Sequence, residues 1–288
     1  MEKIVSPSTI AILLATYNGG QYLKEQLDTL ISQSYHQWHL FVHDDGSTDE
    51  TPAILRFYAQ QYSNISILEY DSQKGPANNF LSLLQRVDAE YYMFCDQDDV
   101  WLNHKIEMSI MKMKEIEAQT PSIPIVICSD LHIVDKDLNI ISRSYWEHAG
   151  IYPQFIKNFD ECAASSVATG CTMLFNHAAK QATRFPAKHA AMHDSWVTLC
   201  TLKRQGILYG IDKQLILYRQ HDNNSLGATS ASVSQFTLSY RIRHFSIMFR
   251  QNKDHYLMLR SLGYGSILKY LSYKIIYKYK IHTKKRHD

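Results

Sequence analysis

Long apolar runs are absent from this sequence of 288 residues, which has no stretch near the roughly 20 apolar residues of a membrane-spanning helix. An excess of one charge is also absent. The sequence has 30 Lys and Arg residues and 28 Asp and Glu residues, and this balance argues against a dedicated nucleic-acid-binding protein. Glycine (11) and proline (7) are scarce while 45% of residues are hydrophobic, so a collagen-like or disordered chain is excluded. A globular protein with a substantial core remains.

A disulfide framework is not indicated either. The five cysteines are an odd number, none stands in a C-x-x-C pair, and most lie in apolar runs: Cys95, Cys128, Cys162, Cys171 and Cys200. We therefore expect buried free thiols in a reducing compartment. The segment Met1–Pro7 lacks the apolar region of a secretory signal, so the predicted location is the cytoplasm.

The first half of the chain alternates apolar runs with segments of helical periodicity. The pattern predicts strands at 10–15, 38–42, 65–70 and 91–95, and helices at 21–33, 52–62, 78–87 and 102–118. A capping box of Ser47 and Glu50 is expected before the second helix. This order is typical of βαβ units, so we predict an α/β fold with a mostly parallel sheet.

The second half is less regular. It predicts strands at 125–134, 138–142, 169–175, 207–209 and 215–219, a helix at 195–203, a loop at 223–234 and helical structure from 235 onward. We therefore expect two parts: an α/β domain over residues 8–225 and a helical, basic C-terminal extension over residues 226–288.

Polar clusters follow three of the predicted strands: Thr16–Gly20, Asp44–Asp49 and Asp96–Asp99. Each could be a simple turn, because turns favour Gly, Asn and Asp. Three such clusters at successive strand ends instead favour a ligand site, because ligands bind at the carboxyl ends of strands in open α/β sheets.

The third cluster indicates a cation. The carboxylates of Asp96 and Asp98 repel each other unless a cation lies between them. Oxygen ligands suit Mg²⁺ or Mn²⁺, which often bridge to substrate phosphates. The P-loop motif G-x-x-x-x-G-K-[ST] and the dinucleotide motif G-x-G-x-x-G are both absent. We therefore predict a metal-assisted site for a ligand that carries a diphosphate.

Five motifs together carry a family resemblance: Ile10–Gly20, His43–Asp49, Asp96–Trp101, Met192–Trp196 and Tyr218–His221. In this order and spacing they resemble the family 2 inverting glycosyltransferases of the GT-A fold. The resemblance implies a Rossmann-like, mostly parallel central sheet flanked by helices. The forms Asp-Gln-Asp-Asp-x-Trp and Met-His-Asp-x-Trp are most similar to rhamnosyltransferases of bacterial surface polysaccharide synthesis.

The resemblance also implies the contacts of the nucleotide. Thr16 and Tyr17 would line the base pocket, and Asp45 would accept a hydrogen bond from the base imide. Asp96 would hold the ribose or the metal.

The remaining implied roles concern the reaction itself. Asp98 would bind Mn²⁺ or Mg²⁺, and His221 would complete the coordination. Asp194 would be the general base that deprotonates the acceptor hydroxyl.

Structural alternatives stay open for several of these residues. Asp194 could be only the N-cap of its helix, Asp99 could cap the helix near residue 102, and His221 could be a solvated or structural histidine. Trp101 and Trp196 could stack on an acceptor, although aromatic residues beside apolar helices are more often core.

The implied function is transfer of one sugar, with inversion, to a hydroxyl of a growing and lipid-linked glycan. The donor we favour is dTDP-L-rhamnose, followed by UDP-glucose or UDP-galactose. Two alternatives belong to other classes: a sugar-nucleotide pyrophosphorylase and a noncatalytic sugar-nucleotide-binding protein.

The basic residues concentrate at the C-terminus. Seven of the 30 lie between Lys269 and Arg286, where Tyr270–Lys280 alternates apolar and aromatic residues with lysine. On a helix this pattern favours an interfacial segment on anionic lipid, at the inner face of the cell membrane. The alternative is a terminal helix that docks on the domain and exposes its lysines.

Overall fold

The structure is a computed structural model that describes residues 4–6, 9–70, 74–165, 167–185, 187, 189–221 and 245–284. Its elements follow in the order β1 (Ile4–Val5), β2 (Ile10–Thr16), α1 (Gly20–Ile31), β3 (Trp38–Asp44), α2 (Thr51–Gln61), β4 (Ile65–Ile67), α3 (Pro76–Arg86), β5 (Val87–Asp88), β6 (Tyr91–Cys95), β7 (Val100–Trp101), α4 (Lys105–Gln119), β8 (Ile125–Val134), β9 (Ile140–Ser142), α5 (Tyr145–Ala149), η1 (Pro153–Phe155), α6 (Phe159–Ala164), η2 (Gly170–Thr172), β10 (Leu174–Asn176), α7 (His177–Ala182), α8 (His193–Lys203), β11 (Ile207–Arg219), α10 (Phe245–Ser261) and α11 (Ile267–Lys284).

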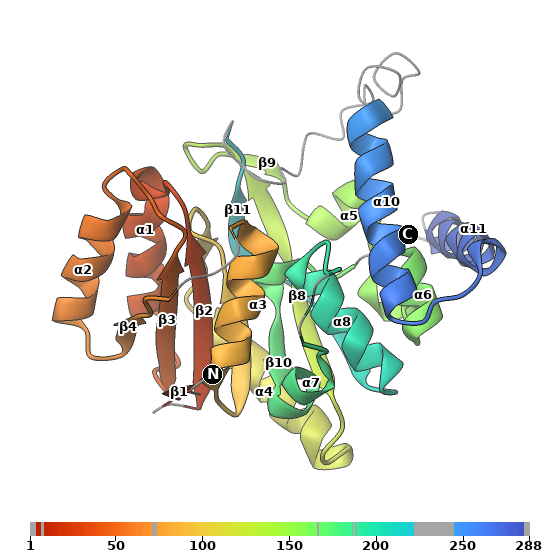
Figure 1. The fold of residues 1–288 in the computed structure, drawn as a ribbon, viewed down its shortest axis with the longest axis horizontal. Coiled ribbons are helices and arrows are strands. Elements are labelled where there is room, and N and C mark those ends of the chain that lie inside the picture. Colours follow the sequence, from red (N-terminus) through yellow and green to blue (C-terminus); the bar gives the residue numbers. More distant parts are fainter. Residues whose placement is uncertain are drawn as a thin grey trace.

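One large sheet organises the molecule, with the strand order β4-β3-β2-β6-β10-β8-β11-β7 and β9 beside β8 (Figure 1). Strands β4, β3, β2 and β6 are parallel, as the alternating pattern predicts. β10 joins this half to β8 through two antiparallel pairings, and β8 pairs in parallel with β11. The predicted α/β fold with a mostly parallel sheet is confirmed, with a mixed second half.

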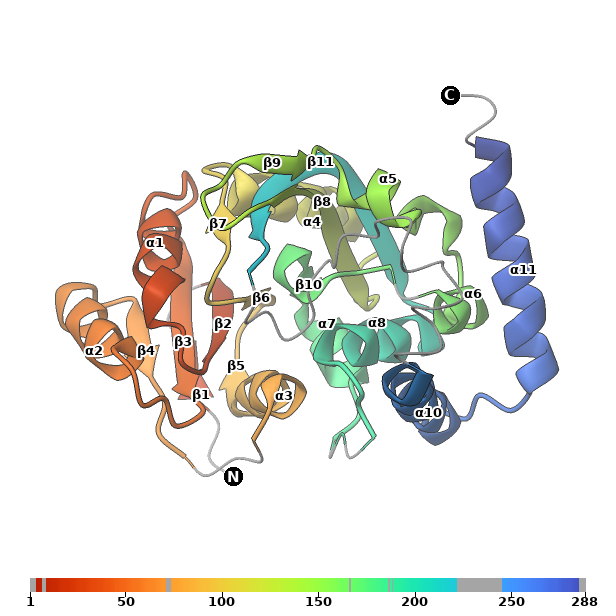
Figure 2. The same cartoon turned by 90° about the horizontal axis from the view of Figure 1, so that it is seen from above.

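Helices cover both faces of the sheet (Figure 2). Along β2, Ile10, Ile12 and Leu14 pack into one apolar cluster with α1, α2 and α4. Ala11 and Leu13 point into a second cluster, which includes residues of α3, α6, α8 and α10. Because alternate side chains of a strand point to opposite faces, both sets of positions must be apolar. The uninterrupted apolar run of this strand is the result.

Several predictions of strand boundaries and one of a helix cap are wrong. The strand expected at 169–175 is a 3₁₀ turn, η2, followed by the short strand β10. The strands expected at 207–209 and 215–219 form a single strand, β11, which accommodates register shifts between Ile211 and Leu217. The expected capping box is also absent, because Glu50 itself is the N-cap of α2 and makes no side-chain cap.

The C-terminal helices pack against the rest of the chain. Met258, Leu259 and Leu262 are buried in the same apolar cluster as α8, and α11 lies beside α6. Helical structure is thus confirmed over the two ranges of α10 and α11, while the loop expected at 223–234 lies outside the described residues. Among the described helices, none combines the length and the apolar character needed to cross a membrane. All five cysteines are buried and free, as predicted.

Candidate active site

The sheet register brings the three polar clusters to one edge. Thr16 pairs with Asp44 at the carboxyl ends of β2 and β3, and Leu14 of β2 pairs with Cys95 of β6. Asp96 therefore begins its loop beside the ends of the other two strands. This edge is where an open α/β sheet binds ligands.

The loop after β3 is held by Asp44. Its carboxylate accepts hydrogen bonds from the Thr16 hydroxyl (2.8 Å), the Ser47 hydroxyl (2.6 Å) and the backbone N–H of Ser47 (2.8 Å). Asp44 is thus occupied in shaping the loop. The adjacent Asp45 accepts a hydrogen bond from the backbone N–H of Gly75 (2.7 Å), which ties the start of α3 to the same edge.

Tyr17 lies on the surface of this edge, with its side chain exposed (56%). Its backbone is clamped by the Gln97 side chain, which accepts from the Tyr17 N–H (2.9 Å) and donates to the Tyr17 carbonyl (3.1 Å). The exposed ring is free to stack on a planar ligand, while Thr16 is buried beneath it.

An acidic cluster stands beside this surface. One side-chain atom from each of Asp96, Asp99 and Cys171 lies within 4.8 Å of the others. Burial and the neighbouring carboxylates of Asp98 and Asp194 raise the pKa of Asp96 to about 7. Burial likewise raises the pKa of Asp99 well above its usual range.

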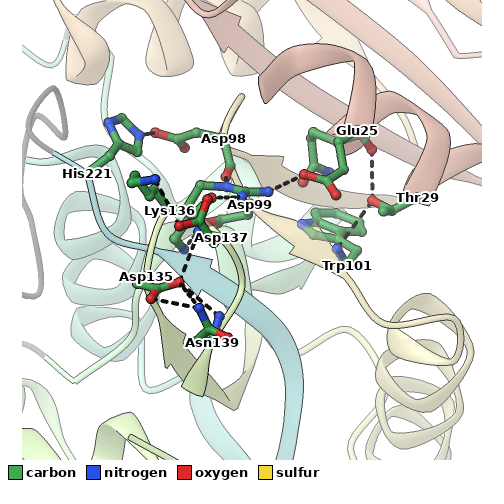
Figure 3. A network of polar contacts seen from close by, with 12 residues as sticks. Glu25, Thr29, Asp98, Asp99, Trp101, Asp135, Lys136, Asp137, Asn139 and His221 are labelled. Carbon is green, nitrogen blue, oxygen red and sulfur yellow. Dashed lines mark hydrogen bonds and ion pairs between the residues drawn. The ribbon is translucent and has the colours of Figure 1, made fainter. Parts of the chain in front are cut away.

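Asp98 belongs to the same turn and contacts a distant histidine. Its carboxylate lies 2.9 Å from the His221 Nε2 atom, and Figure 3 shows the ring facing that carboxylate. The pairing arises because β7 runs antiparallel to β11. The two predicted metal-binding residues are therefore adjacent, although 123 positions separate them in the sequence.

Arg219 fixes the main chain of this turn. It is 2% exposed; its Nε donates to the Asp98 carbonyl (3.0 Å) and its Nη1 donates to the Lys136 carbonyl (2.7 Å). Its Nη2 forms an ion pair with Glu25 of α1, and its guanidinium lies over the Tyr22 ring. One residue thus joins β11, α1 and the acidic turn.

The potential ligand atoms of this cluster fit a divalent cation. Asp99 Oδ2 is buried and has no hydrogen-bond partner among the described residues. An orphaned buried carboxylate oxygen is costly unless a proton or a cation satisfies it. Carboxylate oxygens with one imidazole suit Mn²⁺ or Mg²⁺, and the Cys171 thiol, whose pKa is raised by burial, would remain protonated beside them.

Asp194 lies in the first turn of α8, and the alternative that it is the N-cap is wrong because Met192 holds that position. Its carboxylate accepts from the backbone N–H of Gly170 (3.1 Å) and of Ser195. The residue after Gly170 is Cys171, which belongs to the acidic cluster, so the Asp194 carboxylate lies close to that cluster. Asp194 therefore presents a partly exposed carboxylate near the carboxyl edge of the sheet.

The neighbouring His193 is not suited to the role of base. It is 4% exposed, stacks on Phe80 and meets the edge of Phe94. Burial lowers its pKa to about 4. The ring is therefore a neutral packing group that supports the first turn of α8.

Other sequence alternatives are also resolved. Asp99 does not cap the following helix, because α4 begins at Lys105 with His104 as its N-cap. Trp101 and Trp196 are buried to 2% and 3% exposure and belong to the core, so they offer no acceptor surface.

Three residues of the site region were missed by sequence reasoning. Gln97 and Arg219 stand inside the motifs Asp96–Trp101 and Tyr218–His221, so their positions are a usable signal. Lys105 gave none: it is fully buried, its ammonium lies 3.4 Å from the Trp101 ring centroid, and burial lowers its pKa to about 7.

A cavity of about 340 Å³ opens beside the site. It lies between the first turn of α3, the segment before α8 and the outer helix α10, and its lining includes Asn78, His189, Met192, Asp254 and Leu257. Gly75, which donates to Asp45, also lines the cavity, and Met192 precedes Asp194 by two residues, so the cavity borders the candidate site.

Comparison with known proteins agrees with this geometry. The profile of the family described as Glycosyl transferase family 2 matches residues 11–182. The chain is 29% identical over 231 residues to the dTDP-rhamnosyl transferase RfbG of Shigella flexneri, covering 75% of this chain and 74% of that protein. It is 30% identical over 106 residues to the UDP-Glc:alpha-D-GlcNAc-diphosphoundecaprenol beta-1,3-glucosyltransferase WfgD of Escherichia coli, covering 36% and 40% respectively.

Two solved structures share the fold. TarS 1–349 of S. aureus superposes with a TM-score of 0.60 at 15% identity, covering 97% of this chain and 91% of that one. The mannosyltransferase PcManGT of Pyrobaculum calidifontis, solved with GDP-Man and Mn²⁺, gives 0.54 at 14% identity, covering 94% and 84%. These likenesses confirm the predicted GT-A type of fold.

Proposed function

Because this chain belongs to glycosyl transferase family 2 and is thus a nucleotide-sugar glycosyltransferase, we propose that it transfers one sugar, with inversion, to a hydroxyl of a bacterial surface glycan. The observation that supports the proposal is the hydrogen bond from Gly170 to Asp194, which holds this carboxylate beside Cys171 and the acidic cluster. The profile match ends at residue 182, so the role of Asp194 rests on the resemblance of the motif Met192–Trp196 and on the position of its carboxylate.

In the proposed reaction Asp194 removes the proton of the acceptor hydroxyl. The acceptor oxygen forms a bond to the anomeric carbon while the bond to the diphosphate breaks on the opposite face, and the nucleoside diphosphate leaves. Hydrogen bonds from the backbone N–H groups of Gly170 and Ser195 hold the carboxylate in one orientation.

The residues that would hold the cation are Asp96, Asp98, Asp99 and His221. When bound, Mn²⁺ or Mg²⁺ would offset the charge that develops on the departing diphosphate. On the donor side, the Tyr17 ring would pack on the nucleotide base. The Asp45 carboxylate would accept from the base imide while it keeps its bond to Gly75.

For the donor we propose dTDP-L-rhamnose, with UDP-glucose or UDP-galactose as the alternatives. The similarity to a dTDP-rhamnosyl transferase over three quarters of the chain supports the first choice. A lipid-linked acceptor is supported by the second relative, whose acceptor is a diphosphoundecaprenol-linked sugar. The acceptor sugar would occupy the cavity beside Met192.

We also propose the division into a catalytic domain over residues 8–225 and a helical extension over residues 226–288. Residues of α10 line the acceptor cavity and fill part of the core. The extension therefore folds together with the catalytic domain.

A donor panel tests the proposal. The three donors are incubated with Mn²⁺ and synthetic polyprenyl-diphosphate sugars, and both nucleoside-diphosphate release and glycan mass are followed. We expect acceptor-dependent release that is fastest with dTDP-L-rhamnose and is abolished by EDTA. Formation of nucleoside triphosphate from pyrophosphate would instead identify a pyrophosphorylase.

Asp194→Asn tests the base directly. We expect turnover to fall about 10² to 10⁴-fold with donor affinity unchanged, because the amide cannot take the proton. Asp212→Asn, at an exposed position of β11, is the matched control and should retain full activity. Full acceptor-dependent activity of Asp194→Asn would show that another residue is the base. Donor binding by the wild type without any turnover would favour a noncatalytic binding protein.

A further inference from the structure

Helix α11 uses one face to attach to the catalytic domain. Lys269 and Lys280 form ion pairs of 2.8 and 2.9 Å with Asp160 and Glu161 of α6. The Tyr277 hydroxyl accepts a hydrogen bond of 2.8 Å from the backbone N–H of residue 152, and its ring packs against the core. This face of α11 is therefore committed to docking on the domain. The docking follows one of the two alternatives for this segment, except that two of the lysines form the contacts and are not left to solvent.

The opposite face of α11 carries large apolar side chains in contact with solvent. Leu268, Leu271, Ile275 and Tyr279 are 75%, 49%, 70% and 69% exposed. Their spacing of three and four residues places them on one side of the helix, in a stripe roughly 16 Å long. We call these four residues the α11 stripe. In Figures 1 and 2 the helix lies at the outer edge of the molecule, beyond α6.

The charges around the α11 stripe are all positive. The helix contains no Asp or Glu over its 18 residues. Lys278 is exposed beside the stripe and Lys274 is half-buried on the same flank; neither forms an ion pair within the described part of the chain. The sequence continues with Lys285 and Arg286. An apolar stripe with a cationic flank is the pattern of a helix that lies in the headgroup region of an anionic membrane.

We propose that the α11 stripe seats this protein on an anionic lipid surface, with the helix parallel to the bilayer plane. The docked face stays on α6, so the catalytic domain is carried along without unfolding. A second copy of the chain would cover the α11 stripe less well than lipid does. Two such helices would bring lysines against lysines, with no acidic residue of either helix to pair with them. The inference is independent of the sugar donor and of the reaction.

Vesicle sedimentation with the full chain tests the proposal. The probes are vesicles of 30% phosphatidylglycerol in phosphatidylcholine and vesicles of phosphatidylcholine alone, without donor or acceptor. We expect binding to the anionic vesicles that weakens strongly between 50 and 500 mM salt, and little binding to the neutral ones. Replacing Lys278 by Ser should lower the partition coefficient about fivefold.

Ile275→Glu should lower the partition coefficient at least tenfold, because it removes apolar contact and adds repulsion. The matched control is Phe57→Glu, on α2 at the other end of the molecule, where the ring is 58% exposed. Circular dichroism and donor turnover in solution should be unchanged in both variants. Equal vesicle binding by Ile275→Glu and the wild type would overturn the proposal, as would a wild-type dimer that Ile275→Glu dissociates.

Discussion

Arg219→Met is expected to weaken both the fold and the cation site. The buried guanidinium donates to the carbonyls of Asp98 and Lys136 and forms an ion pair with Glu25. Methionine fills much of the same space and restores none of these contacts.

The size of the effect follows from the contacts. Each hydrogen bond from a charged donor contributes roughly 1.5 to 3 kcal/mol when its acceptor is left unsatisfied. The ion pair adds at most about 1 kcal/mol, because the Glu25 side chain is 48% exposed and well solvated. The total is about 3 to 7 kcal/mol, which corresponds to a decrease of at least about 6 °C in melting temperature for a chain of this size.

The site should respond as well. Without Arg219 the main chain at Asp98 loses an anchor, so Mn²⁺ affinity should fall about 10 to 100-fold. Differential scanning fluorimetry and Mn²⁺ titration of the donor reaction measure the two effects. Arg219→Lys keeps the charge but reaches fewer acceptors. Its melting temperature and its Mn²⁺ affinity should therefore lie between those of Arg219→Met and those of the wild type. A melting temperature within about 2 °C and an unchanged Mn²⁺ dependence for Arg219→Met would refute this role.

Three further predictions concern the same edge. Gly170→Ala should lower turnover at least tenfold, because the new Cβ would lie 2.5 Å from the packed His193 ring and would displace the backbone N–H that donates to Asp194. The control Gly265→Ala, whose new Cβ meets nothing within 4 Å, should leave turnover unchanged in the same assay. Because burial raises the pKa of Asp96 to about 7 and that of Asp99 well above its usual range, cation binding at pH 6 should release more than one proton; calorimetry in two buffers should show Mn²⁺ affinity rising more than tenfold per pH unit below pH 7 and less steeply above it. Lys105→Met removes a buried amine whose pKa is lowered to about 7, so between pH 7 and 10 the unfolded wild type binds a proton that the folded form does not. Wild-type stability should therefore rise with pH in that window, and thermal melts of the variant should show a smaller rise.

Predictions from local pattern succeeded where the cause was local. Strands such as β2 and β6 are buried on both faces, so they appear in the sequence as continuous apolar runs that are followed by polar residues. Errors arose where tertiary pairing overrode local preference. Two short strands became the single strand β11 because it follows β8 through register shifts, and part of the strand expected before β10 became the turn that supplies Gly170 to Asp194.

The sequence by itself determined that this chain forms an α/β sheet with acidic and polar residues at the carboxyl edge, because periodicity and strand ends are properties of neighbouring residues. Only the tertiary structure decided which distant groups meet there. It set His221 and Arg219 against the acidic turn, because β7 pairs with β11 across more than a hundred residues. It also set Cys171 beside Asp96 and Asp99, because η2 packs against β6. It also decided which side of α11 docks and which stays exposed, because the positions of Asp160 and Glu161 on α6 select the docked face.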